Sequence, residues 1–271
     1  MTTTSGETGA LAAVLVLAAV LTAAAAPDHP RLRVDPRDFE ASRADIENLL
    51  QSASRALWKE FPGYALDPIV VVRGRKDPIT LFERNARGEI VVQLNTGSTY
   101  WAQYSYQWAH EFCHILCGFR KQPRENNWFE ETLCELASLY VLRAMGTSWE
   151  HDPPYPNWKE YRHSLRAYAD DVMAKREKLT PDGLARFYKL HEGELRGNGI
   201  RRDLNGAMAG ALLPLLEEDP SRWEAVRWLN AAPATKGMSF RDYLAKWSAA
   251  APPRHRPFIA RLAALFGQRG R

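Results

Sequence analysis

The chain has 271 residues, of which 45% are hydrophobic and 25% are charged, and its formal net charge is +4. This composition is typical of a globular protein with a sizeable core and excludes a disordered chain. The basic residues are spread along the sequence and no nucleic-acid-binding module is visible, so we expect no nucleic-acid partner.

An apolar run lies near the start of the chain, from Ala10 to Ala26. Its small residues are typical of a secretory signal peptide, with Ala23 and Ala25 at the positions of a cleavage site. An uncleaved anchor is the alternative, because about 17 apolar residues is the shortest length that spans a membrane. Either leader, over residues 1–26, places the body of the protein outside the cytoplasm, where it would be secreted or periplasmic. If the leader is not cleaved, residues 10–26 anchor the protein, and we expect no other contact with the membrane.

The next segments alternate between polar stretches and short apolar runs. Residues 27–37 are polar and contain prolines, which predicts a linker. Apolar residues at helical spacing predict an amphipathic helix over residues 38–60, and the Phe61–Gly63 segment ends it. Three apolar runs with turn residues between them predict short strands. These runs are Pro68–Val72, Ile79–Phe82 and Glu89–Leu94.

Helical patterns dominate the rest of the chain. One helix is predicted from about Tyr100 to Cys117 and a second from about Asn127 to Met145, each followed by glycine. Further helical segments, separated by proline and glycine, are predicted over 157–178, 181–191, 202–217, 220–230, 239–249 and 254–267. We therefore expect an α+β protein with one lobe over residues 38–150, built of a small mixed sheet and two helices, and an all-helical C-terminal lobe over 151–271.

The first of these two helices carries the sequence His-Glu-x-x-His between His110 and His114. Residues four apart on a helix share a face at about 5–6 Å, so both imidazoles can bind one Zn²⁺. Glu111 points to the side of such a metal, where it can take a proton from zinc-bound water, whose pKa the metal lowers toward about 7. Cys117 and Arg120 stand where a metzincin has glycine and histidine, which excludes that class.

The second helix offers a third ligand. Glu131 and Glu135 are four residues apart and share a face. We expect Glu131 to bind the metal and Glu135 to accept a hydrogen bond from the free N–H of a ligand histidine. A solvent-exposed acidic face is the alternative for this pair taken alone, but its place after the histidine helix favours a metal site.

The His-Glu-x-x-His sequence followed by Trp128-x-x-Glu131 resembles the gluzincin metallopeptidases, in which a glutamate from the following helix completes the zinc site. The resemblance covers about residues 88–146, and the Trp-x-x-Glu element is similar to the aminopeptidase branch. It implies a zincin-like lobe, Zn²⁺ on the two histidines and Glu131, Glu111 as the base, and Glu89–Leu94 as the edge strand beside the substrate. The Gly-x-Met-Glu-Asn element that holds a substrate amino terminus in those aminopeptidases is not found here, so endopeptidase and exopeptidase action both stay open.

A zinc peptidase also needs a donor for the oxyanion that forms during attack. We expect it from the C-terminal helical part, where the eligible side chains are Tyr155, Tyr161, His163, Tyr168, His191, Arg201 and Arg202. Tyr161 and Tyr168 are the two candidates that we name. A packing or surface role is the alternative for each.

Three cysteines, Cys113, Cys117 and Cys134, lie on or beside the two site helices. An odd, low number is no disulfide framework. We rank buried apolar thiols first, then a disulfide from Cys134 to Cys117 or to Cys113, and metal ligation last.

These features together predict a zinc metallopeptidase outside the cytoplasm that hydrolyses peptide bonds in a peptide or protein substrate. One alternative is a non-catalytic, zinc-containing binding or envelope protein with the same fold. Another is a zinc hydrolase of a non-peptide amide. The presence of Glu111 favours catalysis, because metal binding alone would not require it.

Overall fold

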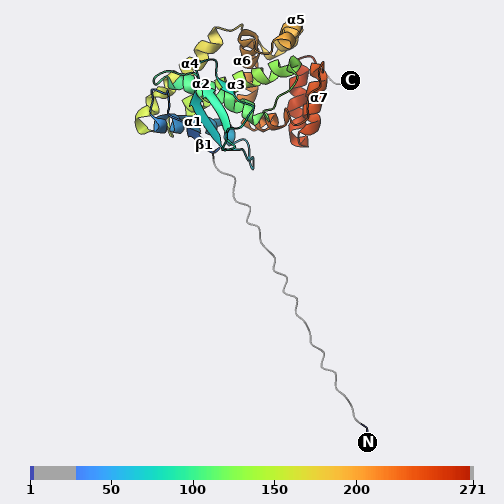
Figure 1. Cartoon of the computed structure of the whole chain (residues 1–271). Coiled ribbons are helices and arrows are strands. Elements are labelled where there is room, and N and C mark those ends of the chain that lie inside the picture. The colour runs from blue at the N-terminus through green and yellow to red at the C-terminus, as the bar shows by residue number, and fades with distance from the viewer. Residues whose placement is uncertain (3–28, 269–271) are drawn as a thin grey trace.

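The computed structural model of the chain describes residues 1–2 and 29–268 (Figure 1). The expected leader lies outside these residues except for its first two positions. Among the described residues, no helix is both long and apolar enough to cross a membrane.

A four-stranded mixed sheet forms one side of the molecule, in the order β1-β2-β4-β3. The strands are β1 (Leu32–Val34), β2 (Ile69–Arg73), β3 (Ile79–Thr80) and β4 (Ile90–Leu94). β1, β2 and β4 run parallel, whereas β3 is antiparallel to β4. The three predicted strands are therefore present, and a fourth, β1, lies inside the segment that we expected to be a linker.

The edge strand differs from our expectation. β4 was expected at the edge, but it lies between β2 and β3, and β3 forms the edge of the sheet. β4 pairs with β2 on one side and with β3 on the other, whereas β3 pairs with β4 alone among the described strands. The two-residue β3 leaves Ile79 48% exposed, as suits an edge.

The helices follow the predicted segments closely. They are α1 (Arg43–Trp58), α2 (Trp101–Leu116), α3 (Asn127–Ser148), α4 (Arg162–Ala174), α5 (Leu184–Gly197), α6 (Arg202–Glu218), α7 (Phe240–Ala250) and α8 (Arg256–Leu265). Short 3₁₀ turns lie at Arg124–Asn126, Pro156–Tyr161, Pro181–Gly183, Pro220–Trp228 and Pro253–His255. The elements from residue 151 to 268 are all helical, so the predicted α+β class and helical C-terminal half are confirmed.

Helix α3 lies at the centre of the molecule. It packs against α1, α2, α4 and α6, and most of its residues are buried on every side. In Figure 1, α1 and α7 lie towards opposite ends of the molecule, with α2 and α3 between them. One continuous cluster of buried hydrophobic side chains extends from Val34 to Phe266, so the N-terminal and C-terminal halves share a core.

The buried surroundings of α3 make its acidic residues unusual. A carboxylate removed from water is costly unless hydrogen bonds or opposite charges compensate it. Nevertheless Glu130 and Glu135 on this helix are buried, and Glu131 between them is nearly so. The partners of these three carboxylates define the candidate site.

Candidate metal centre

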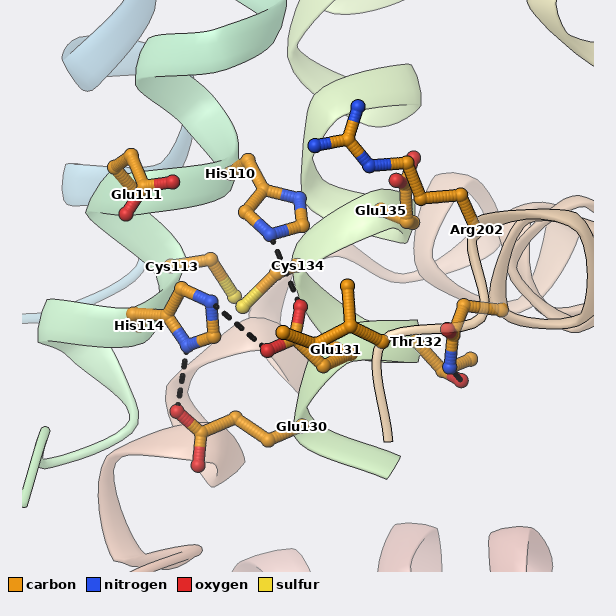
Figure 2. A network of polar contacts seen from close by, with 12 residues as sticks. His110, Glu111, Cys113, His114, Glu130, Glu131, Thr132, Cys134, Glu135 and Arg202 are labelled. Carbon is orange, nitrogen blue, oxygen red and sulfur yellow. Dashed lines mark hydrogen bonds and ion pairs between the residues drawn. The ribbon is translucent and has the colours of Figure 1, made fainter. Parts of the chain in front are cut away.

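The last two turns of α2 hold the two predicted histidine ligands. The rings of His110 and His114 lie 5.1 Å apart between centroids, with an interplanar angle of 69°. Both side chains are mostly buried, at 16% and 11% exposed, and they face α3 (Figure 2). The helix ends directly afterwards, because Gly118 adopts a positive φ of 75° that residues with a Cβ rarely adopt.

Glu131 faces both histidines at once. Its Oε2 lies 3.3 Å from Nε2 of His110, and its Oε1 lies 3.7 Å from Nε2 of His114 (Figure 2). Tetrahedral Zn²⁺ with bonds of about 2.0–2.1 Å separates neighbouring ligand atoms by roughly 3.3 Å. The structure therefore brings Glu131 beside both predicted histidine ligands, through a different carboxylate oxygen for each.

A second carboxylate, that of Glu130, contacts the other ring nitrogen of His114. Oε1 of Glu130 lies 2.7 Å from Nδ1 of His114, and its Oε2 accepts a hydrogen bond of 2.7 Å from Nδ2 of Asn230. The hydroxyl of Tyr243 donates in turn to Oδ1 of Asn230, at 3.1 Å. Because Nδ1 is occupied by Glu130, Nε2 is the nitrogen that His114 turns towards Glu131 and a metal.

This supporting role was assigned to Glu135, and at His114 the structure gives it to Glu130 instead. Glu130 lies about 100° around the helix from Glu131, so helical spacing alone placed it away from the site. It reaches His114 because the ring lies between α2 and α3 and presents its two nitrogens to different residues of α3. Glu130 is buried, which marks it as a residue with a polar partner inside the protein, but the spacing of residues along a helix cannot predict that burial.

Glu135 has a different partner. Its carboxylate accepts a hydrogen bond from the hydroxyl of Tyr106, which lies one turn before His110 on α2. Burial, together with the charge of Glu135, raises the pKa of Tyr106, so this hydroxyl keeps its proton and donates it. The charge of Glu135 also favours the protonated form of His110, so it acts on the site through electrostatics.

The two tyrosines predicted as oxyanion donors lie away from the ligands. The hydroxyl of Tyr161 accepts a hydrogen bond from the backbone N–H of Ala102, which is about 12 Å before His110 along the helix axis. Tyr168 packs its ring against that of Tyr106, with 5.7 Å between centroids. In the part of the chain that the structure describes, neither forms a hydrogen bond to the histidines or to Glu131.

Arg202 is the eligible side chain that does approach the site. It is the first residue of α6, and Figure 2 draws it among the polar residues around the two histidines. The preceding loop reaches the start of α3 because Gly199 has no side chain: a Cβ there would lie 2.9 Å from the backbone nitrogen of Trp128. Arg202 is 55% exposed and lies 3.2 Å from Oδ1 of Asp77, in the segment before β3.

Glu111, the predicted base, contacts the sheet. It is 3% exposed, and its Oε2 accepts a hydrogen bond of 2.9 Å from the hydroxyl of Thr80 in β3. The charge of Glu111 favours the protonated forms of His110 and His114, so the predicted base acts on the same histidine pair that Glu131 faces.

The three cysteines are free thiols, and all are fully buried. This confirms the first of the three interpretations of the cysteines. The Sγ of Cys134 and one ring nitrogen from each histidine nevertheless all lie within 4.8 Å of one another. Burial raises the pKa of Cys134, so a metal would have to displace its proton before this thiol could bind. Cys134 is therefore a second candidate for a ligand, one that helical spacing did not favour.

The carboxylates raise the pKa of both histidines when no metal is bound. Burial lowers the pKa of His114, but the hydrogen bond to Glu130 and the charges of Glu130, Glu131 and Glu111 outweigh it and raise the pKa to about 10. The pKa of His110 is raised in the same way, chiefly by Glu131 against the opposing effect of burial. The same negative charge would stabilise a bound cation, so protons and metal compete for one set of atoms.

Comparison with family models, with curated proteins and with solved structures finds no match to this chain. The structure thus supports a cluster of side chains that can hold a metal ion, within an α+β fold.

Proposed function

We propose that the protein is a zinc-dependent metallopeptidase that hydrolyses peptide bonds with metal-activated water, similar to the gluzincins. The observation that carries this proposal is the position of the Glu131 carboxylate, which faces Nε2 of both histidines at 3.3 and 3.7 Å. The charge of Glu111 raises the pKa of the same histidines, beside which a non-catalytic site would need no such carboxylate.

His110, His114 and Glu131 are the proposed ligands. When bound, the zinc supplies a Lewis acid and a water molecule whose pKa is lowered toward about 7. Three protein ligands leave a fourth position for that water, as in other catalytic zinc sites. Glu130 fixes the ring of His114, which keeps the ligand set in place while the substrate enters and leaves.

Two further side chains complete the proposed mechanism. Glu111 takes a proton from the attacking water and passes it to the nitrogen of the leaving amine. Arg202, which Figure 2 draws in the polar network around the histidines, is our candidate donor to the oxygen on which negative charge develops. Its ion pair with Asp77 is exposed to solvent, so a substrate can replace Asp77 at little cost.

The edge strand β3 offers a binding site for an extended peptide. Leu81 donates its backbone N–H to the carbonyl of Val91, at 2.9 Å, so the backbone groups of Thr80 point away from β4. Thr80 is 2% exposed, so a peptide pairs with it only after the groups that cover it move aside. Among residues 29–268 no further strand pairs with this edge. A peptide can add to such an edge through main-chain hydrogen bonds, which suits a substrate with varied side chains.

Exposed apolar side chains flank the same edge. Ile79 and Phe82 are 48% and 54% exposed. The ring of Phe82 stacks on that of Phe119, at 4.4 Å between centroids, and Phe119 lies 6.0 Å from the ring of His114. We infer that the site prefers apolar side chains next to the bond that is cleaved.

One observation favours a second candidate function. If Cys134 occupies the fourth position on the metal, as its distance from both histidines allows, the site is closed and no water can be activated. The protein would then be a non-catalytic, zinc-containing protein, in which the metal stabilises the packing of α2 on α3.

Metal analysis of the full-length protein tests both candidates. Protein purified without chelator or added metal should carry close to one zinc per chain, and Glu131→Ala should lose it. Glu111→Gln should keep the zinc and abolish the cleavage of fluorescein-labelled casein and of a synthetic peptide library read by mass spectrometry. A wild-type protein that holds no zinc and takes none up would contradict the metal site. Stoichiometric zinc without cleavage of either probe would favour the closed, non-catalytic site.

A further inference from the structure

We propose that Thr80 is a positioning residue for Glu111, and that the edge strand sets the direction of the base through this single hydroxyl. The inference deepens the proposed function and rests on it, because it gives Glu111 the role of a base. It joins two features that the sequence places far apart: an edge strand that can pair with a peptide and a carboxylate beside two histidines.

The contact between the two side chains is buried and short. Thr80 is 2% exposed and Glu111 is 3% exposed. The hydroxyl of Thr80 lies 2.9 Å from Oε2 of Glu111 and 3.3 Å from the backbone carbonyl oxygen of the same residue. A hydroxyl has one proton to donate, and the shorter distance and the negative charge both favour the carboxylate.

This hydrogen bond fixes one oxygen of the base and leaves the other available. In the described part of the chain, the hydrogen bonds of the Glu111 side chain involve Oε2. Oε1 is therefore the oxygen that can receive a proton from water at the metal. Without Thr80, the carboxylate would be buried with no donor and could rotate freely about its last bonds, which would cost both orientation and stability.

A threonine at this position also brings stiffness. The branched Cβ of threonine restricts its first side-chain torsion, and this preference suits a strand. A serine would keep the hydroxyl but would sample more rotamers, and a valine would keep the shape but lose the donor. The expected order of effect on Glu111 is therefore threonine, then serine, then valine.

The backbone of Thr80 gives the contact its link to the substrate. Its N–H and C=O point away from β4 and are covered, since the whole residue is 2% exposed, whereas its side chain points towards α2. A peptide that pairs with β3 would form hydrogen bonds with the backbone of the residue whose side chain orients the base. Loss of the hydroxyl leaves this backbone edge intact, so it should lower kcat and leave KM nearly unchanged.

Steady-state kinetics on a peptide that the wild-type protein cleaves provides the first test. Thr80→Val should lower kcat about ten- to a hundred-fold, the range for loss of a hydrogen bond to a charged group, and Thr80→Ser should restore most of it. Thr96→Val is the matched control, because Thr96 is also 2% exposed and follows β4, and it should leave kcat and KM unchanged. Equal effects of Thr80→Val and Thr96→Val, or a change confined to KM, would overturn the inference.

A second readout does not need turnover. A hydroxamic acid binds a metal through two oxygens and gives a proton to a base beside it, so its affinity reports on the position of Glu111. In the cobalt-substituted full chain, titration with acetohydroxamic acid followed by visible absorption should give Thr80→Val an affinity between those of the wild type and Glu111→Gln. An affinity for Thr80→Val equal to that of the wild type would refute the role of Thr80, even where the peptidase activity stands. Conversely, a wild-type protein that binds cobalt and the hydroxamate but cleaves no peptide would refute the proposed function and leave the Thr80 comparison readable.

Discussion

The α3 side and the β3 side of the metal centre are built differently. On the α3 side, Glu130 joins His114 to Asn230 and Tyr243 in a buried chain of short contacts. On the β3 side, a single threonine hydroxyl reaches Glu111, and the side chains just beyond it are half exposed. The first side is fixed by several elements at once, as a metal site requires, whereas the second lies at a sheet edge, as an extended substrate requires.

The two sides also differ in which segments of the chain supply their residues. The α3 side depends on residues from α7 and from the segment before it, so the C-terminal half supports a ligand without contacting the metal. The β3 side depends on the sheet, which packs on α2. Substitutions on the α3 side should therefore affect stability and metal binding, and those on the β3 side should affect turnover.

The largest effect should come from Glu130→Ala. This change leaves the ring of His114 and the amide of Asn230 buried without the carboxylate that both contact. Removing one partner of a buried ion pair costs about 3–5 kcal/mol. We expect the free energy of unfolding of the metal-free protein to fall by that amount in urea denaturation. Glu150→Ala, at an exposed position after α3, is the control and should change stability little. A loss of unfolding free energy no greater than that of the control would mean that the contacts of Glu130 with His114 and Asn230 do not stabilise the fold.

The next effect is expected at Arg202 and concerns activity. Removal of one donor to a developing oxyanion lowers kcat by about 10²–10³-fold, so Arg202→Ala should fall in that range without loss of zinc. Asp77→Asn separates this role from the surface ion pair, because it removes the pair and keeps the guanidinium. We expect Asp77→Asn to keep wild-type kcat. If both variants lose activity equally, Arg202 acts through its contact with Asp77 and not on the substrate.

The α3 side should also give the metal-free protein a characteristic pH dependence. The folded protein holds the pKa of His114 at about 10, above the ordinary value of 6.5, so its proton stabilises the fold fully below about pH 6.5. That stability should be lost as the pH rises through about 10. Thermal unfolding with a chelator present should therefore show a falling Tm between these two pH values.

Zinc provides the control for this pH dependence. Bound metal requires the neutral imidazole, so the zinc-loaded protein should lose the dependence on the protonation of His114. A metal-free protein whose Tm stays constant over this range, or that behaves like the zinc-loaded form, would contradict the ion pairs of His114 with Glu130 and Glu131.

The parts of the site that the sequence predicted are those that depend on helix geometry or on a local motif. His110 and His114 were predicted together because residues four apart on a helix share a face, and Glu131 was predicted from its Trp-x-x-Glu element, which resembles a known motif. Glu130 was missed because α3 is buried on all sides, so its apolar pattern does not mark which carboxylate faces α2. Thr80 was missed, and Arg202 was eligible but not preferred, because their approach depends on tertiary packing: the pairing of a two-residue strand and a close loop contact at Gly199.

The sheet was likewise predicted only in part, because strand pairing depends on tertiary packing. The three apolar runs marked strands correctly, but their order in the sheet depends on which strands pair, and spacing along the chain does not encode that. Likewise, Leu32 and Val34 were read as part of a linker because the prolines around them outweighed a three-residue strand that forms only by pairing with β2.

The smallest effect distinguishes the open site from the closed one. Cys134 and Cys117 are both fully buried free thiols, so Cys134→Ala and Cys117→Ala should each lower the free energy of unfolding of the metal-free protein by about 1 kcal/mol. Zinc affinity is where the two variants can differ, because the thiol of Cys134 approaches both histidines. With Glu131 as the third ligand and water in the fourth position, both variants should bind zinc as tightly as the wild type, within a few-fold, in a competition titration with a chromophoric chelator. If Cys134→Ala alone binds zinc far more weakly, the thiol occupies the position that the water needs, and side chains of α2 and α3 together close the coordination shell.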